Sequence, residues 1–211
     1  MKAMHMLCVV ALVAWGLLPS LGQEALMPAQ PKTAQLNEQG QVTVAGHSTA
    51  YLIRRLPVSS FPELPASVVN ALNRRGCTIP QTYEARRPEN VVHASLEHAG
   101  SSDWAVLCSV DGTVSLLVFF DGGAEVGEQR TTVLASAREK ERLQGHSGSA
   151  VLGFNWGIDP ASPQQVHDAQ IGMEKRPPRV DHDALGDSVV DQGTIYHFYA
   201  KSAWTVLDMP N

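Results

Sequence analysis

The chain has 211 residues and a formal net charge of −5, with 16 lysines and arginines against 21 aspartates and glutamates. No stripe of basic residues interrupts this acidic balance, so nucleic acid is a poor candidate partner. Without an N-terminal signal, the length of about 190 residues suits one domain with a single core.

Residues 1–22 have the pattern of a secretory signal peptide. Lys2 precedes an apolar run from Met6 to Leu18, and Ser20-Leu21-Gly22 offers a small-residue cleavage site. The run is about 13 residues long, whereas a transmembrane helix needs about 20. We therefore predict cleavage, release into a periplasm or the medium, and no membrane span in the mature chain. Retention of the segment as an anchor is the alternative.

Residues 23–45 are expected to form a flexible leader, because Gln, Pro and Ala dominate there and large apolar side chains are few. Order is expected to begin weakly over 41–45 and firmly at Tyr51-Leu52-Ile53. A single globular domain is therefore placed at 46–211.

A short helix is predicted over 65–75, where Leu64, Val68 and Leu72 have helical spacing. Its last turn carries two arginines, which suit the helix dipole at that end, and Gly76 provides the left-handed stop.

The mature chain keeps two cysteines, Cys77 and Cys108. Because thiols oxidise outside the cytosol, we predict a disulfide between them, which would contribute about 3–4 kcal/mol to stability by the chain-entropy model. Two unpaired thiols, or a metal or redox pair, are the alternatives. The separation of 31 residues is not the CxxC spacing of redox sites.

The middle of the chain has the strongest strand signal. Apolar runs cover 91–97, 103–110 and 113–120, and Asp111-Gly112 is a favoured two-residue hairpin turn. This turn places Val110 opposite Thr113 and Cys108 opposite Ser115. Two apolar faces result, one with Trp104, Val106, Cys108, Leu117 and Phe119, the other with Leu107, Val114, Leu116, Val118 and Phe120. A hairpin with two apolar faces is expected at the centre of the fold.

Further elements follow towards the C-terminus. Strands are predicted over 131–137 and 150–156, separated by a charged turn over 138–144. Ser162-Pro163-Gln164-Gln165 has the pattern of a capping box that opens a second helix. A final hairpin over 194–200 and 203–208 would pair Tyr199 with Trp204 and His197 with Val206. The fold class is therefore α+β, with a mostly antiparallel sheet of about five or six strands and two short helices packed on it.

The stretch Gly145-His146-Ser147-Gly148-Ser149 resembles the sequence around the nucleophile of trypsin-like serine proteases. It makes Ser147, with His146 beside it, the candidate catalytic residue. Such a nucleophile needs a histidine base, an acid and a backbone oxyanion pocket. His47 lacks the Ala-Ala-His-Cys context of that family, and the preferred interpretation is a Gly/Ser-rich surface loop.

Four acids, Asp181, Asp183, Asp187 and Asp191, form the second candidate site, because carboxylates in this density can bind a hard cation such as calcium. The spacing is not that of an EF-hand, since Leu185 stands at the third ligand position. A solvated loop, with an acid stabilising a turn before the last hairpin, is the preferred interpretation, and no cofactor is predicted beyond this calcium alternative.

The remaining polar residues give no ligand set by spacing. His93 and His98 are expected on opposite faces of one strand, and His197 beside the aromatic hairpin. Asp111, Asp121 and Asp187 are expected in turns, so no carboxylate pair for glycoside hydrolysis stands out.

The segments Asn90-Val91-Val92-His93 and Asp103-Trp104-Ala105-Val106-Leu107-Cys108 resemble a lineage of uncharacterised secreted bacterial proteins, in which a helix ending at Gly-Cys precedes such a hairpin. That resemblance covers about residues 60–121 and the chain from about 181 onward, and it implies export and a shared fold. The Asp-Trp-Ala-Val-Leu portion is also similar to the strand of an FG-GAP repeat, although His98-Ala99-Gly100-Ser101-Ser102 replaces the calcium loop of that family.

The sequence favours an exported, non-catalytic binding or envelope-associated protein whose partner is an unknown protein or cell-envelope component. Its expected contact surface includes Tyr196, Tyr199 and Trp204. The alternative is an exported hydrolase that uses Ser147 or a carboxylate pair, with metal assistance at the acidic segment.

Overall fold

A computed structural model describes residues 36–123, 130–171, 176 and 179–207. The expected signal peptide and most of the expected leader lie outside these residues. The described part contains two α-helices, three short 3-10 segments and two sheets, named A and B.

Sheet A has nine strands: β1 (Asn37–Val44), β2 (His47–Pro57), β3 (Thr78–Gln81), β4 (Val91–Ala94), β5 (Asp103–Val110), β6 (Thr113–Phe119), β7 (Thr131–Arg138), β8 (Leu143–Gln144) and β9 (Leu152–Phe154). Their main order is β7-β6-β5-β3-β2-β9-β8, with β1 paired to β2 and β4 paired to β5. The β2–β9 pair is parallel and the others are antiparallel.

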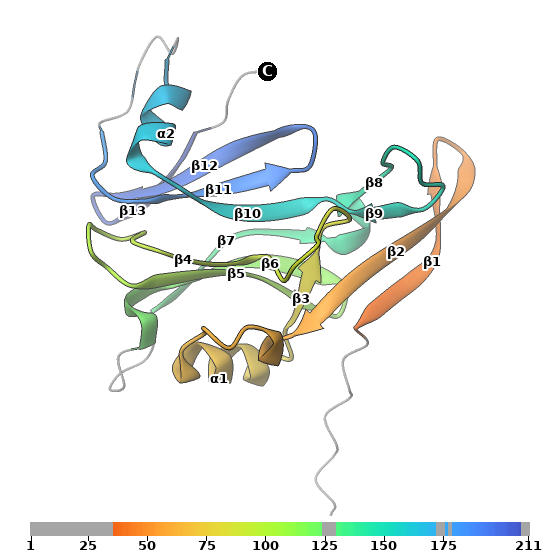
Figure 1. Cartoon of the computed structure of the whole chain (residues 1–211), viewed down its shortest axis with the longest axis horizontal. Coiled ribbons are helices and arrows are strands. Elements are labelled where there is room, and N and C mark those ends of the chain that lie inside the picture. The colour runs from red at the N-terminus through yellow and green to blue at the C-terminus, as the bar shows by residue number, and fades with distance from the viewer. Residues whose placement is uncertain (1–35, 124–129, 172–175, 177–178, 208–211) are drawn as a thin grey trace, which may run out of the picture. The chain divides into compact units, whose positions relative to one another are not determined.

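Sheet B has four antiparallel strands in the order β10 (Trp156–Ala161), β11 (Ala184–Val189), β12 (Gly193–Ala200) and β13 (Ala203–Leu207). Figure 1 shows it over the β4–β6 part of sheet A, with α1 (Ala66–Arg75) on the other side of sheet A and α2 (Pro163–Ala169) against sheet B. The predicted sheet of about five or six strands is therefore wrong, because sheet A alone has nine strands with one parallel pair, and the chain then forms a second sheet of four.

The crossing between the sheets occurs at one buried residue, Asn155, inside the segment predicted as a single strand over 150–156. Its backbone N–H donates to the carbonyl oxygen of Arg142 at 2.9 Å, and its own carbonyl oxygen accepts from the N–H of Val190 at 2.9 Å. Asn155 thus bonds to the residue just before β8 of sheet A and to the residue just after β11 of sheet B. The apolar run over 150–156 does not by itself indicate that its two halves belong to different sheets.

The central hairpin has the predicted register, with Val110 opposite Thr113 and Cys108 opposite Ser115. Its two predicted faces are also confirmed. The face with Leu107 and Leu116 contributes to an apolar cluster between the sheets, and the face with Trp104 contributes to a second cluster under α1.

The predicted helix is confirmed as α1, which buries Val68, Ala71 and Leu72 and ends at Gly76 with φ 72°. The structure also contains the Cys77–Cys108 disulfide, directly after this helix end. The bond therefore joins the helix terminus to β5. The expectation of two short helices is confirmed as well, and Ser162 and Gln165 form the predicted capping box of α2.

The N-terminal hairpin of β1 and β2 lies partly within the range expected as leader. It turns at Ala45 and Gly46, both with positive φ. β1 is mostly polar, and it pairs with β2 along its whole length. Two side chains of β2 add to this pairing, since Tyr51 and Arg55 both donate to the Glu38 carboxylate at 2.7 Å. Hydrophobic periodicity does not reveal these polar partners.

Candidate functional site

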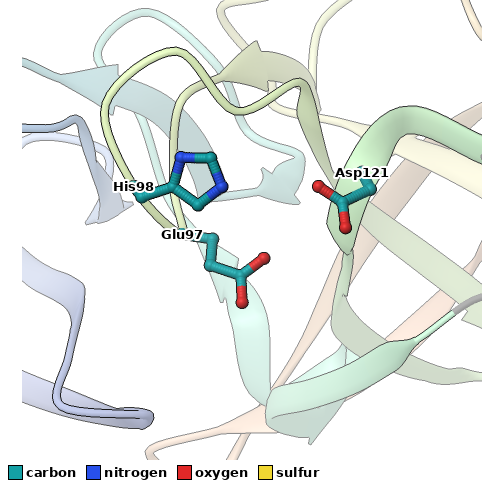
Figure 2. A group of neighbouring side chains, drawn as sticks. All are labelled: Glu97, His98 and Asp121. Carbon is teal, nitrogen blue, oxygen red and sulfur yellow. The ribbon is translucent and has the colours of Figure 1, made fainter.

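Three ionisable side chains, Glu97, His98 and Asp121, form a cluster whose ligand-type atoms all lie within 4.8 Å of one another. Figure 2 shows Glu97 and His98 on the loop that follows β4, with Asp121 facing them from η2 (Phe120–Gly123). His98 and Asp121 are exposed, and Glu97 is half-buried. This is the only group of three or more such residues in the described part of the chain.

One buried carboxylate, that of Asp103 at the start of β5, bonds to both backbone segments that carry the cluster. Asp103 Oδ2 accepts from the N–H groups of Leu96 and Glu97, each at 2.8 Å, and from the Ser101 hydroxyl at 2.5 Å. Asp103 Oδ1 accepts from the N–H of Asp121 at 2.8 Å. Because both backbone segments bond to one fully buried side chain, Glu97 and Asp121 are held near each other.

The backbone of the cluster has the tight geometry that this attachment needs. The loop after β4 closes through a bond from the N–H of Ser101 to the carbonyl oxygen of His98, 3.0 Å long, with Gly100 at φ 83°. Asp121 itself adopts φ 56°, a conformation that aspartate accepts more readily than most residues.

Arg130, at the start of the segment leading into β7, adds a positive charge to the cluster. Its guanidinium forms an ion pair with Glu97 and lies 4.4 Å from the centre of the Phe120 ring. The hydrogen bond to Glu97 raises the pKa of Arg130, and Asp121 and Tyr199 act in the same direction. The carboxylate of Glu97 is therefore already neutralised by a residue of the chain.

Two half-buried aromatic side chains of the last hairpin lie beside this cluster and pack against the apolar cluster between the sheets. Tyr199 and Trp204 pair across β12 and β13 as predicted, with ring centroids 5.3 Å apart in an edge-on arrangement. Phe120 contacts both rings, at 5.4 and 6.0 Å. We name Glu97, His98, Asp121, Arg130, Tyr199 and Trp204 the aromatic–charged surface.

The first half of the predicted acidic segment lies beside this surface. Asp183 pairs with Ser95 on the loop after β4, through its N–H to the Ser95 carbonyl at 2.9 Å and through its carboxylate to the Ser95 N–H at 3.1 Å. Exposed Asp181 contacts His182 Nδ1 at 3.1 Å, which lowers the pKa of Asp181, and His98 contributes in the same direction. The negative charge of the surface thus includes Asp181.

The second half of that segment lies elsewhere. Asp187 is buried in β11, where it accepts a 2.6 Å bond from Trp156 Nε1 and lies 3.1 Å from His197 Nε2. Asp191 lies in the β11–β12 turn and accepts from the Tyr83 hydroxyl at 3.0 Å. The four acids therefore do not converge on one cation, because Asp181 and Asp183 precede β11, Asp187 lies within the extended strand and Asp191 lies in the turn beyond it. Asp187 is a strand residue, which corrects its expected place in a turn.

Ser147, the candidate nucleophile, lies exposed in the loop between β8 and β9. Within the described residues it makes no hydrogen bond to a histidine or a carboxylate. Its neighbour His146 stacks on Tyr83, with ring centroids 4.4 Å apart. The structure thus shows a surface loop at this position, and it does not bring a base to the hydroxyl.

Two further predictions are corrected by the sheet geometry. His98 does not share a strand with His93, because β4 ends at Ala94 and His98 belongs to the following loop. Tyr196 does not share a face with Tyr199, since three residues along a strand reverse the side, and it packs instead near the cluster beside α2.

The sequence did not single out Glu97, Asp103 or Arg130. Asp103 is the first residue of the apolar strand β5, and its carboxylate was a detectable signal, since aspartate is uncommon in a strand buried on both sides. The meeting of Glu97 with Arg130 was not detectable, because 33 residues separate them in the chain.

Comparison of the chain with protein-family models, with curated proteins and with solved structures finds no match to any of them. In the stretches that the structure describes, no helix has the length and apolar character needed to cross a bilayer.

The cluster has the ligand types of a divalent-cation site, one imidazole and two carboxylates. A cation there would compete with Arg130 for Glu97. The arrangement supports recognition more directly, because it places charges of both signs beside aromatic rings. The charged residues are held by the buried Asp103 carboxylate, and the rings belong to a regular hairpin.

Proposed function

We propose that the protein is an exported, non-catalytic binding protein that recognises a protein or another macromolecule of the cell envelope through the aromatic–charged surface. The observation that carries this proposal is the convergence of Glu97, Asp121 and Arg130 with the Tyr199–Trp204 pair. These residues come from three distant parts of the chain. Aromatic and arginine side chains are the types enriched where protein interfaces gain most of their binding energy.

Rigidity favours binding at this surface. The loop after β4 and the start of η2 are both attached to Asp103, and the aromatic pair belongs to a regular hairpin. A surface whose backbone is ordered before contact loses less conformational entropy when a partner binds. Export is supported by the signal-peptide pattern and by the Cys77–Cys108 disulfide, which is typical of oxidising compartments.

The test is site-specific photo-crosslinking in cells that export the protein, with p-benzoylphenylalanine placed at Tyr199. The control position is Asp111, in the turn at the opposite end of the β5–β6 hairpin. We expect a discrete crosslinked species from Tyr199 that disappears when the Glu97→Lys substitution is added. The same products from both positions, or a product indifferent to Glu97→Lys, would contradict the proposal.

A further inference from the structure

A second feature of the molecule is a groove of about 620 Å³ between the segment 82–90 and the first half of sheet B. Its lining includes Arg86 and Arg87 on one side and Gly157, Asp159 and Ser188 of β10 and β11 on the other. The volume lies within the range of about 300–1,000 Å³ that is typical of small-molecule sites. Ser188 pairs with Thr194 near the β11–β12 turn, so the groove lies at the opposite end of these strands from Tyr199.

The wall formed by residues 82–90 is held at both ends by side chains. Gln81 and Glu89 exchange two bonds, of 3.0 and 3.1 Å, and the Glu89 carboxylate also accepts from the Thr82 N–H at 2.7 Å. Arg54 of β2 donates to the carbonyl oxygens of Thr82 and Ala85 at 2.7 and 3.1 Å. The segment is therefore an ordered loop rather than a strand of a sheet.

Asn90 fixes the same wall to the edge of sheet B. Its side-chain Nδ2 donates to the carbonyl oxygen of Trp156 at 3.3 Å, and its Oδ1 accepts from the N–H of Ile158 at 3.0 Å. Asn90 is buried and adopts φ 70°. The groove consequently has two walls whose backbones are fixed relative to each other.

The charges in the groove define the ligand chemistry. Arg86 and Arg87 are exposed, and within the described residues neither forms an ion pair. The Glu89 carboxylate already accepts a hydrogen bond from the Thr82 N–H. The carboxylates of Glu84 and Asp159 are exposed and can accept hydrogen bonds from a ligand. Guanidinium groups bind carboxylates and phosphates in a bidentate manner, and carboxylates accept hydrogen bonds from hydroxyl groups.

We propose that this groove binds a small polar molecule that carries a carboxylate or phosphate group, held by Arg86 and Arg87, together with hydroxyl groups that donate to the acids of the groove. The proposal stands apart from the aromatic–charged surface and does not depend on the function proposed there. An anionic sugar has this combination of groups. Gly157 lies at the floor of the groove, which stays open because glycine has no side chain. A Cβ at this position would make only an ordinary contact with Thr82, at 3.6 Å.

The experiment uses three hexose probes that differ in one group: glucose 6-phosphate, glucuronate and unsubstituted glucose. Binding to the oxidised protein is measured by NMR through the backbone amides of Gly157 and Ser188, at probe concentrations up to about 10 mM. We expect saturable shifts with at least one anionic probe and at least about tenfold weaker binding of glucose. A preference between phosphate and carboxylate would identify the source of the anionic group.

Two variants and a matched control decide whether the groove is the site. Arg86→Ala/Arg87→Ala should weaken anionic-probe binding at least about tenfold. Arg74→Ala/Arg75→Ala should leave it unchanged, because it makes the same charge change with two exposed arginines at the end of α1. Gly157→Val keeps both groove arginines and should block binding by filling the floor.

Three results would overturn the proposal. One is no saturable binding of either anionic probe, and another is equal binding of glucose. The third is an equal loss in both arginine pairs, which would show only a general charge effect. Circular dichroism of each variant confirms that the comparison is made on folded protein.

Discussion

The two faces of sheet A are built on different physical principles. The face towards α1 is apolar and covalently linked, since the disulfide joins Cys77 to Cys108 within a cluster of buried hydrophobic side chains. The face towards sheet B also has an apolar cluster, but Arg55 and Asp103 point to the same side as its members. Asp187 and His197 face it from sheet B.

This difference separates two ways of stabilising a sheet. On the α1 side apolar contacts stabilise without a specific polar partner, and the disulfide lowers the entropy of the unfolded chain. On the inter-sheet side each buried polar group needs its partner, because a donor or acceptor that is left alone keeps its full desolvation cost. The inter-sheet side should therefore respond more strongly to single substitutions that remove a partner.

The largest effect is expected from Asp103→Ala. The substitution leaves four donors without their acceptor, and we expect a loss of about 3–5 kcal/mol in the free energy of unfolding. Urea denaturation measures it, with the exposed Asp159→Ala as the control expected to change stability by less than about 0.5 kcal/mol. A loss below about 1 kcal/mol would mean that water replaces the carboxylate.

The apolar face is tested by removing its covalent link with Cys77→Ala/Cys108→Ala. A closed loop with a sequence separation of 31 residues predicts a loss of about 3–4 kcal/mol by the chain-entropy model. Urea denaturation of the variant and of the oxidised protein gives the difference. A much smaller loss would show that the unfolded chain is already restricted without the bond.

Two buried tryptophans allow a matched comparison of the faces. Trp156 donates to Asp187, whereas the indole N–H of Trp104, on the α1 side, has no hydrogen-bond partner within the described residues. Trp156→Phe and Trp104→Phe remove the same atoms. We expect Trp156→Phe to cost about 1–3 kcal/mol more, because only this substitution removes the donor of a buried carboxylate oxygen, Asp187 Oδ1. Equal losses in thermal or urea unfolding would refute this distinction.

The smallest effect concerns acid stability. The hydrogen bond from Arg55 lowers the pKa of Glu38 from its ordinary value of 4.5 to about 2. The folded state therefore gains stability that is fully present above pH 4.5 and is lost as the pH falls towards about 2. Glu38→Gln should make stability less dependent on pH in this window. An unchanged pH profile from urea titrations would show that the Glu38 interaction adds nothing to folding.

Local pattern was sufficient for the elements that bury apolar side chains in a regular period. The helix ending at Gly76, the Asp111-Gly112 turn with its register and the Tyr199–Trp204 pair were all predicted from neighbouring residues. Each depends on interactions that span only a few positions, or on one turn that fixes two strands.

The rest depends on pairings between distant segments. The parallel contact of β2 with β9 joins Tyr51 to Leu152, and no periodic pattern in either strand specifies the other. The aromatic–charged surface has the same origin, since Asp121 and Glu97 meet through their shared bonds to Asp103. From sequence alone, polar residues in loops are predicted to be solvated. The sequence does not show that a buried carboxylate brings two such loops together.

The attachment of Asn90 to β10 has a consequence for how the protein behaves in a crowded compartment. β10 is an edge strand of sheet B, and an open edge invites pairing with a second chain. The Asn90 amide occupies the carbonyl of Trp156 and the N–H of Ile158, and Pro160 has no N–H to offer. The Asn90 side chain and Pro160 thus oppose the addition of another strand at this edge. Asn90→Ala should free the backbone groups of Trp156 and Ile158 for pairing with a second chain, and sedimentation experiments should then show concentration-dependent association.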